Sequence, residues 1–195
     1  MEQLTPLMPD APAERLERVA AIKRKAGRSG EFVIVTLETN YSQHGQLCIR
    51  EERDIVYRDA PRNDARNSLQ DEKKRPPPAA SLALDLIPDP VLLFRFSALT
   101  FNSHRIHYDR EYAMSTEGYS DLVVHGPLSA VLLAELVRKH SKVPIRDFSF
   151  RAVRPLFANR PLHLRGEFHD GSFALAAYDD HGFLAVEAQA GLGAP

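Results

Sequence analysis

The sequence predicts an α+β fold in which an antiparallel sheet wraps around one long buried helix. One observation is an apolar helix pattern over residues 126–140, and another is the row of four strand-like segments that follows it. Because a sheet and a helix each have an apolar side to bury, packing those strands around the helix covers both. A third observation, a hairpin pattern rich in β-branched residues at 31–57, adds strands to the N-terminal part.

The helix at 126–140 has the clearest signals in the chain. Pro127 suits a first helical turn, and the basic residues 138–140 favour the negative end of the helix dipole. Residues 130–136 are almost all apolar, so we expect burial on more than one side of the helix. The stripe of apolar side chains consists of Leu128, Val131, Leu132 and Leu136.

The C-terminal strands are predicted over residues 147–157, 161–168, 173–178 and 183–190. Turn signals separate them at residues 159–160, 170–171 and 179–182. Each of these turns contains Asn, Asp or Gly, the residues that tolerate tight backbone bends.

The N-terminal hairpin is predicted from residues 31–39 and 47–57, with a polar turn over residues 40–44 before Gly45. Residues 11–26 remain open on local signals. Leu16, Val19 and Ala20 have helical spacing, but a strand leading into residue 32 fits equally well. Residues 58–81 contain ten charged residues and four prolines, which is typical of an exposed linker.

Composition excludes several classes of function. The 25 basic and 26 acidic residues nearly cancel, so we expect no nucleic-acid partner. The single cysteine, Cys48, makes neither an intramolecular disulfide nor a cysteine zinc site. No apolar run approaches a membrane span of ~18 residues, and no signal peptide opens the sequence, so we expect no membrane partner and a cytoplasmic location.

Polar residues that could take part in catalysis are concentrated between positions 102 and 109. Histidine exchanges protons near neutral pH, so two histidines this close are a candidate acid/base pair. Clustered loop histidines are more often structural, and the residues alone leave both interpretations open. The cluster consists of Asn102, His104, Arg105, His107, Tyr108 and Asp109, and His125 precedes the long helix.

A metal site is the other interpretation of the same cluster. His104, His107, Asp109 and His125 offer nitrogen and oxygen ligands. On extended backbone, however, an offset of three residues puts two side chains on opposite faces of the chain. We therefore predict no metal site and no cofactor.

Residues 100–113, together with His125-Gly126, resemble the MaoC-like branch of the hotdog-fold hydratases and dehydratases. The signature of that family is Gly-Asp-x-Asn-Pro-[Ile/Leu/Val]-His, followed by Asp and a Tyr/Phe-Ala pair. Here His107 falls on the signature histidine, Asn102 on the catalytic aspartate and His104 on the asparagine. Residues 93–100, 118–119, 122–128 and 148–156 resemble one subgroup more closely, namely the mesaconyl-CoA (3-methylfumaryl-CoA) hydratases and the mitochondrial-type 3-hydroxyacyl-thioester dehydratases.

The resemblance implies addition or removal of water across the 2,3 double bond of an acyl thioester of CoA or acyl carrier protein, with mesaconyl-CoA as the leading substrate. His107 would be the general acid/base, helped by His104, while Asn102, which cannot titrate, would orient the water. Gly126 would offer an amide to the thioester oxygen as an oxyanion hole. The expected supporting residues are Asp109, Tyr108, Arg105 and His125.

Other functions remain open beside this one. An acyl-CoA thioesterase would cleave the thioester instead of hydrating the acyl chain. A non-catalytic thioester-binding remnant is the third possibility, because Asn102 replaces an acid and the N-terminal part is short.

The resemblance also implies a division of the chain. Residues 1–60 would be a partial N-terminal hotdog of about three strands without its helix, which favours a strand for residues 15–26. Residues 61–87 would be the linker and 88–195 the catalytic hotdog domain. Since the missing helix would leave an apolar sheet face uncovered, we expect a homodimer.

Overall fold

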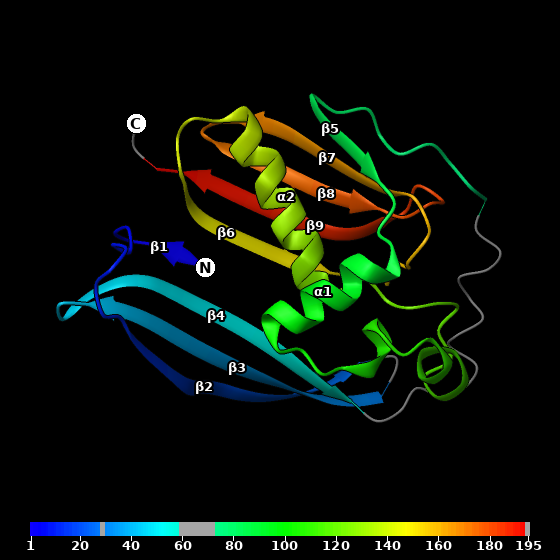
Figure 1. Ribbon diagram of the computed structural model, residues 1–195, viewed down its shortest axis with the longest axis horizontal. Coiled ribbons are helices and arrows are strands. Elements are labelled where there is room, and N and C mark those ends of the chain that lie inside the picture. Colours follow the sequence, from blue (N-terminus) through cyan, green and yellow to red (C-terminus); the bar gives the residue numbers. More distant parts are fainter. Residues whose placement is uncertain (28–29, 59–72, 194–195) are drawn as a thin grey trace. The chain divides into compact units, whose positions relative to one another are not determined.

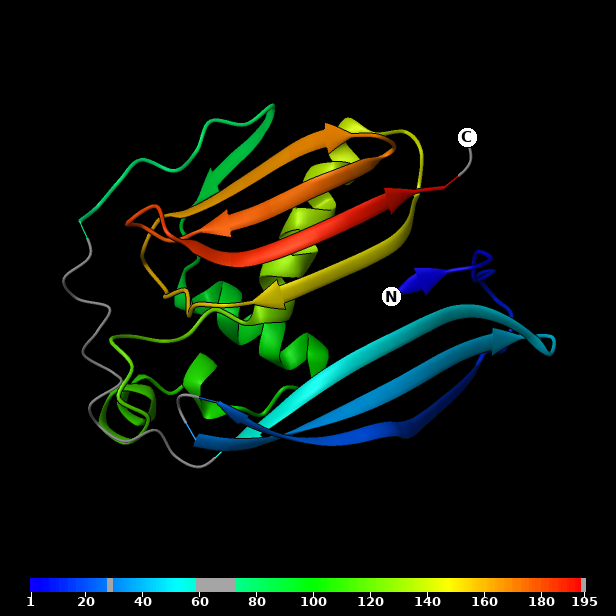
Figure 2. The same ribbon diagram turned by 180° about the vertical axis from the view of Figure 1, so that it is seen from behind.

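Two compact units make up the chain, spanning Met1–Asp71 and Glu72–Pro195. A computed structural model describes residues 1–27, 30–58 and 73–193 (Figures 1 and 2). Within those residues, no helix is long and apolar enough to span a membrane.

The first unit is an antiparallel sheet in the order β2-β3-β4-β1. Its strands are β1 (Glu2–Gln3), β2 (Glu14–Gly27), β3 (Gly30–Gln43) and β4 (Gln46–Arg58), and its described residues include no helix. The strand alternative for residues 11–26 is therefore correct, and the predicted hairpin is confirmed. Its turn is tighter than expected, because only His44 and Gly45 leave the ladder, both with positive φ, as a two-residue hairpin turn requires.

The second unit contains a five-stranded antiparallel sheet in the order β6-β9-β8-β7-β5. The strands are β5 (Leu82–Leu86), β6 (Ile145–Ala152), β7 (Leu162–His169), β8 (Ser172–Tyr178) and β9 (Leu184–Leu192). Helix α2 (Gly126–His140) lies across one face of this sheet, as Figures 1 and 2 show. Side chains of α2 such as Leu133 and Val137 are fully buried with sheet residues such as Leu164. The predicted sheet around a buried helix is confirmed, and α2 has the predicted bounds.

Helix α1 (Pro90–Thr100) was not predicted from the sequence. The Asp89 side chain caps it by accepting the Leu92 N–H at 2.7 Å, and Pro90 stands in its first turn. Phe101 ends it in the left-handed region with φ of 52°. That reversal turns the chain directly into the polar cluster at 102–109.

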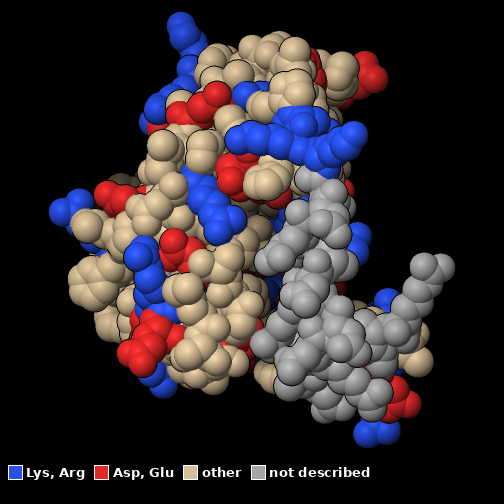
Figure 3. Space-filling model, turned by 90° about the vertical axis from the view of Figure 1, so that its right-hand side faces the viewer, with Lys and Arg blue, Asp and Glu red and all other residues tan. Residues whose placement is uncertain are grey.

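Strand β5 lies inside the range 61–87 that we predicted as a linker. Its alternating burial and its pairing with β7 make Leu82–Leu86 an edge strand of the second unit. The predicted linker residues 61–72 lie outside the described part of the chain. On the face shown in Figure 3, Lys and Arg side chains lie among Asp and Glu side chains.

Candidate active site

The first turn of α2 presents free backbone amides. The first bond inside the helix runs from the Ser129 N–H to the His125 carbonyl at 3.2 Å. The amides of Gly126 and Leu128 precede it, and Pro127 has no N–H. These amides and the helix dipole favour a negative charge placed there.

A second segment positions His107 next to that helix start. The 3₁₀ turn Arg105–His107 buries the imidazole of His107, and its Nδ1 lies 2.7 Å from the Val123 carbonyl oxygen. A carbonyl only accepts, so Nδ1 carries the proton and donates it. In the neutral ring Nε2 is therefore the basic nitrogen.

The rings of His107 and His125 are stacked. Their centroids are 3.6 Å apart and their planes meet at 19°. The ring of His104 stands edge-on to His107, with centroids 5.6 Å apart. The expectation that His104 and His107 face opposite sides was wrong, because the turn has three residues per rotation and brings them together.

His125 is fully buried between His107 and helix α1. Its Nε2 lies 2.8 Å from the Ser97 hydroxyl, and the ring of Phe96 meets it edge-on at 4.9 Å. Burial, followed by charge on His107 and His104, lowers the pKa of His125 to about 4. Burial also lowers the pKa of His107, against the hydrogen bond to Val123. Both shifts favour the neutral form of the two rings near neutral pH.

Asn102 follows α1 and is held at both its backbone and its side chain. Its N–H donates to the Ser97 carbonyl at 2.9 Å, and its Oδ1 accepts the His104 N–H at 3.0 Å. Since the partner of Oδ1 is a donor, the amide NH₂ group remains to donate to another oxygen.

The remaining predicted residues brace this loop. The Asp109 carboxylate accepts from Arg105 at 2.7 Å and from the Tyr112 N–H at 3.0 Å, and these donors lower the pKa of Asp109, with the Tyr112 N–H as the larger cause. The Tyr108 hydroxyl donates to the Ser103 carbonyl at 2.8 Å.

Two residues of the cluster were missed from the sequence. Ser97 and Phe96 contact His125 from α1, and the sequence alone predicted no role for them. The available signal was Ser97, a small polar residue in a helical segment that is mostly apolar. Among the described residues, no group of three or more His, Cys, Asp or Glu is arranged to hold a metal ion.

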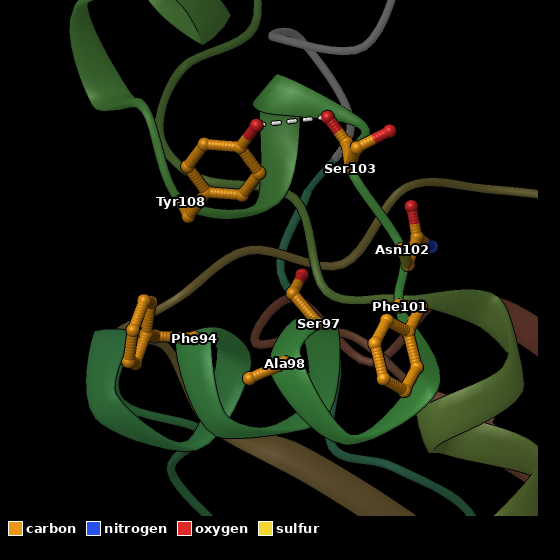
Figure 4. A pocket seen from close by; sticks show the side chains of 7 residues that line it. All are labelled: Phe94, Ser97, Ala98, Phe101, Asn102, Ser103 and Tyr108. Atoms are coloured by element: carbon orange, nitrogen blue, oxygen red, sulfur yellow. Dashed lines mark hydrogen bonds between the residues drawn. The ribbon is translucent and has the colours of Figure 1, made fainter.

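A shallow pocket of about 330 Å³ lies beside Ser97 and Asn102. Figure 4 shows Phe94 on α1, Phe101 directly after the end of that helix, and the Tyr108 ring across from the helix. None of the seven lining residues carries a charge, so the pocket fits an apolar group: they are Phe94, Ser97, Ala98, Phe101, Asn102, Ser103 and Tyr108.

The sheet wrapped around α2, with the motif histidine stacked beside the start of that helix, defines a MaoC-like hotdog protein. Residues 1–158 match the family model described as hydroxyacyl-thioester dehydratase type 2. The chain belongs to this family, and the resemblance and fold predicted from the sequence are confirmed.

The chain is 46% identical over 188 residues to the mesaconyl-C(4)-CoA hydratase of Chloroflexus aurantiacus, covering 96% of this chain and 66% of that protein. It is 35% identical over 126 residues to the mitochondrial hydroxyacyl-thioester dehydratase type 2 of Schizosaccharomyces pombe, covering 63% of this chain and 40% of that one. The crystal structure of HtdX from Mycobacterium tuberculosis superimposes with a TM-score of 0.73 at 22% identity, covering 98% of this chain and 74% of that one. The chain thus spans less than two thirds of the length of these two curated relatives.

Proposed function

We propose that this protein is a hydro-lyase that adds water to, or removes it from, the 2,3 double bond of an acyl thioester. The observation that carries the proposal is the stack of His107 on His125, the residue directly before the amides that open α2. This juxtaposition supplies a proton carrier and an oxyanion site side by side, which is what the reaction requires.

In the hydration direction, the neutral Nε2 of His107 takes a proton from water as the water oxygen bonds to Cβ. Electron density moves onto the thioester oxygen, where the amides of Gly126 and Leu128 would stabilise the enolate. The protonated His107 then gives its proton to Cα. The amide NH₂ of Asn102 would hold the oxygen of the attacking water, or of the leaving hydroxyl in the reverse direction.

Two observations favour different acyl groups. The 46% identity to a mesaconyl-C(4)-CoA hydratase supports a short branched or dicarboxylic enoyl-CoA. The uncharged pocket at Phe94 and Phe101 supports an uncharged 3-hydroxyacyl or enoyl chain, since a free carboxylate there would have no cationic partner among the lining residues.

A thioesterase is the second candidate function, and the Ser97–His125 contact favours it. A hydroxyl 2.8 Å from an imidazole nitrogen resembles a nucleophile beside its base. However, a pKa of about 4 makes His125 a weak base. In addition, its Nδ1 has no hydrogen-bond partner among the described residues to orient it.

The test is turnover of mesaconyl-, crotonyl- and longer enoyl-CoA thioesters by the purified protein. We expect loss of enoyl absorbance without release of free CoA thiol. Thiol release instead would establish the thioesterase, and binding without turnover of any substrate would establish a non-catalytic remnant. Acyl-carrier-protein thioesters belong in the same panel.

The acting form that we propose is a homodimer in the cytoplasm. Val19 and Ile22 on β2 are more than half exposed, which supports a partner over that sheet. Cys48 is a free, buried thiol, which is compatible with a reducing compartment.

A further inference from the structure

We propose that His125, anchored by Ser97, is a positioning residue that holds the imidazole of His107 in its reactive orientation. The inference rests on the proposed function, because it gives His125 a part in the proton transfer by His107. Nothing in the reaction requires His125 to touch the substrate.

The ring of His107 is restrained by two different segments. The Val123 carbonyl fixes Nδ1 at 2.7 Å, which sets one point of the ring but leaves it free to tilt about that bond. The flat face of His125, 3.6 Å from centroid to centroid, removes that freedom. Together the two contacts aim Nε2 in one direction.

His125 is itself held more rigidly than packing alone requires. The Ser97 hydroxyl lies within hydrogen-bond distance of its Nε2, and the ring of Phe96 packs edge-on against it, so two neighbouring residues of α1 hold the ring in place. Its side chain is fully buried, and its Nδ1 has no partner among the described residues. A leucine would fill such a space without leaving a polar atom unpaired, so a packing role alone gives no reason for an imidazole here.

The charges around the pair favour a neutral His125 that supports His107, rather than a His125 that acts as a second proton carrier. In the described part of the chain, His107 and His104 are the titratable groups that lower the pKa of His125, and His104 is the one that lowers the pKa of His107. Two imidazolium rings stacked at this distance would repel strongly, so only one ring of the pair can gain a proton. His107 has the lone pair directed away from its carbonyl anchor, and His125 remains neutral beneath it.

The experiment compares the wild type with Ser97→Ala, His125→Leu and the double variant Ser97→Ala/His125→Phe. Leucine keeps the apolar volume but removes the flat ring. The double variant keeps an aromatic ring at position 125. It also removes the Ser97 hydroxyl, which would have no partner beside phenylalanine. Three quantities are measured for each folded protein: kcat and KM with crotonyl-CoA, and the solvent-exchange rate of the His107 Nδ1 proton by NMR.

We expect His125→Leu to lower kcat about 100-fold with little change in KM, because a small displacement of a catalytic group costs about that much. The double variant and Ser97→Ala should each lose about three- to tenfold, on the same reasoning about displacement. The Nδ1 proton of His107 should exchange faster than in the wild type in all three variants, and fastest in His125→Leu.

Equal exchange rates in all four proteins would overturn the inference. The inference would also be overturned if the double variant had a kcat as low as that of His125→Leu while its His107 Nδ1 proton exchanged at the wild-type rate. His125 would then carry a proton itself. A folded wild type that turns over no enoyl thioester would overturn the proposed function instead, while the exchange rates would still decide whether His125 positions His107.

Discussion

At the scale of single residues, the most selective substitution is His107→Asn. The Asn amide can replace Nδ1 as the donor to the Val123 carbonyl, but it offers nothing in place of Nε2. We expect kcat to fall by about 10²–10⁴-fold, the usual contribution of a general acid/base, with little change in the unfolding temperature. Turnover at the wild-type rate in His107→Asn, or in the more drastic His107→Ala, would remove His107 from the mechanism.

A second residue-scale prediction concerns pH and stability. The pKa of His125 is about 4 in the folded protein against 6.5 for an ordinary histidine. Between those values the unfolded chain binds a proton that the folded protein does not, so acidification favours unfolding. The free energy of unfolding should fall between pH 6.5 and 4 by up to about 3 kcal/mol from this group. Urea titrations at several pH values measure it, and His125→Phe should flatten the curve over that range.

At the scale of elements, the start of α2 offers a test that leaves the fold intact. A Cβ on Gly126 would meet Ala152 and Phe150 only at ordinary contact distances of 3.6 and 3.9 Å. The protein itself therefore leaves room for alanine, and the need for glycine would come from the approaching thioester oxygen. We expect Gly126→Ala to keep its unfolding temperature and to lose about 10²-fold in kcat, since a displaced oxyanion costs about 2.7 kcal/mol or more. An unchanged kcat would mean that the oxyanion hole does not lie at Gly126.

The hairpin turns of the second unit provide a matched pair of glycines. Gly171 and Gly182 both have φ near +80°, but only at Gly182 would a Cβ collide with the backbone carbonyl of Arg75. Gly171→Ala should cost about 1 kcal/mol of stability from backbone conformation alone, and Gly182→Ala clearly more. Thermal unfolding of the two variants isolates the contact between residue 75 and the β8–β9 turn. Equal losses would mean that this contact gives way easily.

Elements with strong local signals were predictable, and those defined by partners were not. Helix α2 was found with its bounds because Pro127, an apolar centre and a basic end all agree. Strand β5 was missed because it is short, follows a proline-rich stretch and is stabilised by pairing with β7. The candidate site was predicted through the family motif, whereas Ser97 and Phe96 were missed because only the fold brings α1 against His125.

At the scale of the whole molecule, the exposed apolar residues of the first unit predict self-association. Val19 pairs with Leu37, and Ile22 pairs with Val35, so these four share one face of the β2–β3 ladder. Val19 and Ile22 are 57% and 67% exposed. We expect a dimer by sedimentation velocity, and the double variant Val19→Lys/Ile22→Lys should shift it toward the monomer. A wild-type monomer at micromolar concentration would contradict the proposal.

The carbonyl of Val123 has a consequence for stereochemistry. By occupying one nitrogen of the His107 ring, it would leave a single atom, Nε2, both to take the proton from the water that attacks Cβ and to deliver a proton to Cα. One atom reaches only one side of a planar alkene, so hydrogen and hydroxyl should arrive from the same side. Hydration in deuterium oxide would then yield one diastereomer, the syn product, whereas the anti product would require a second proton donor on the opposite side.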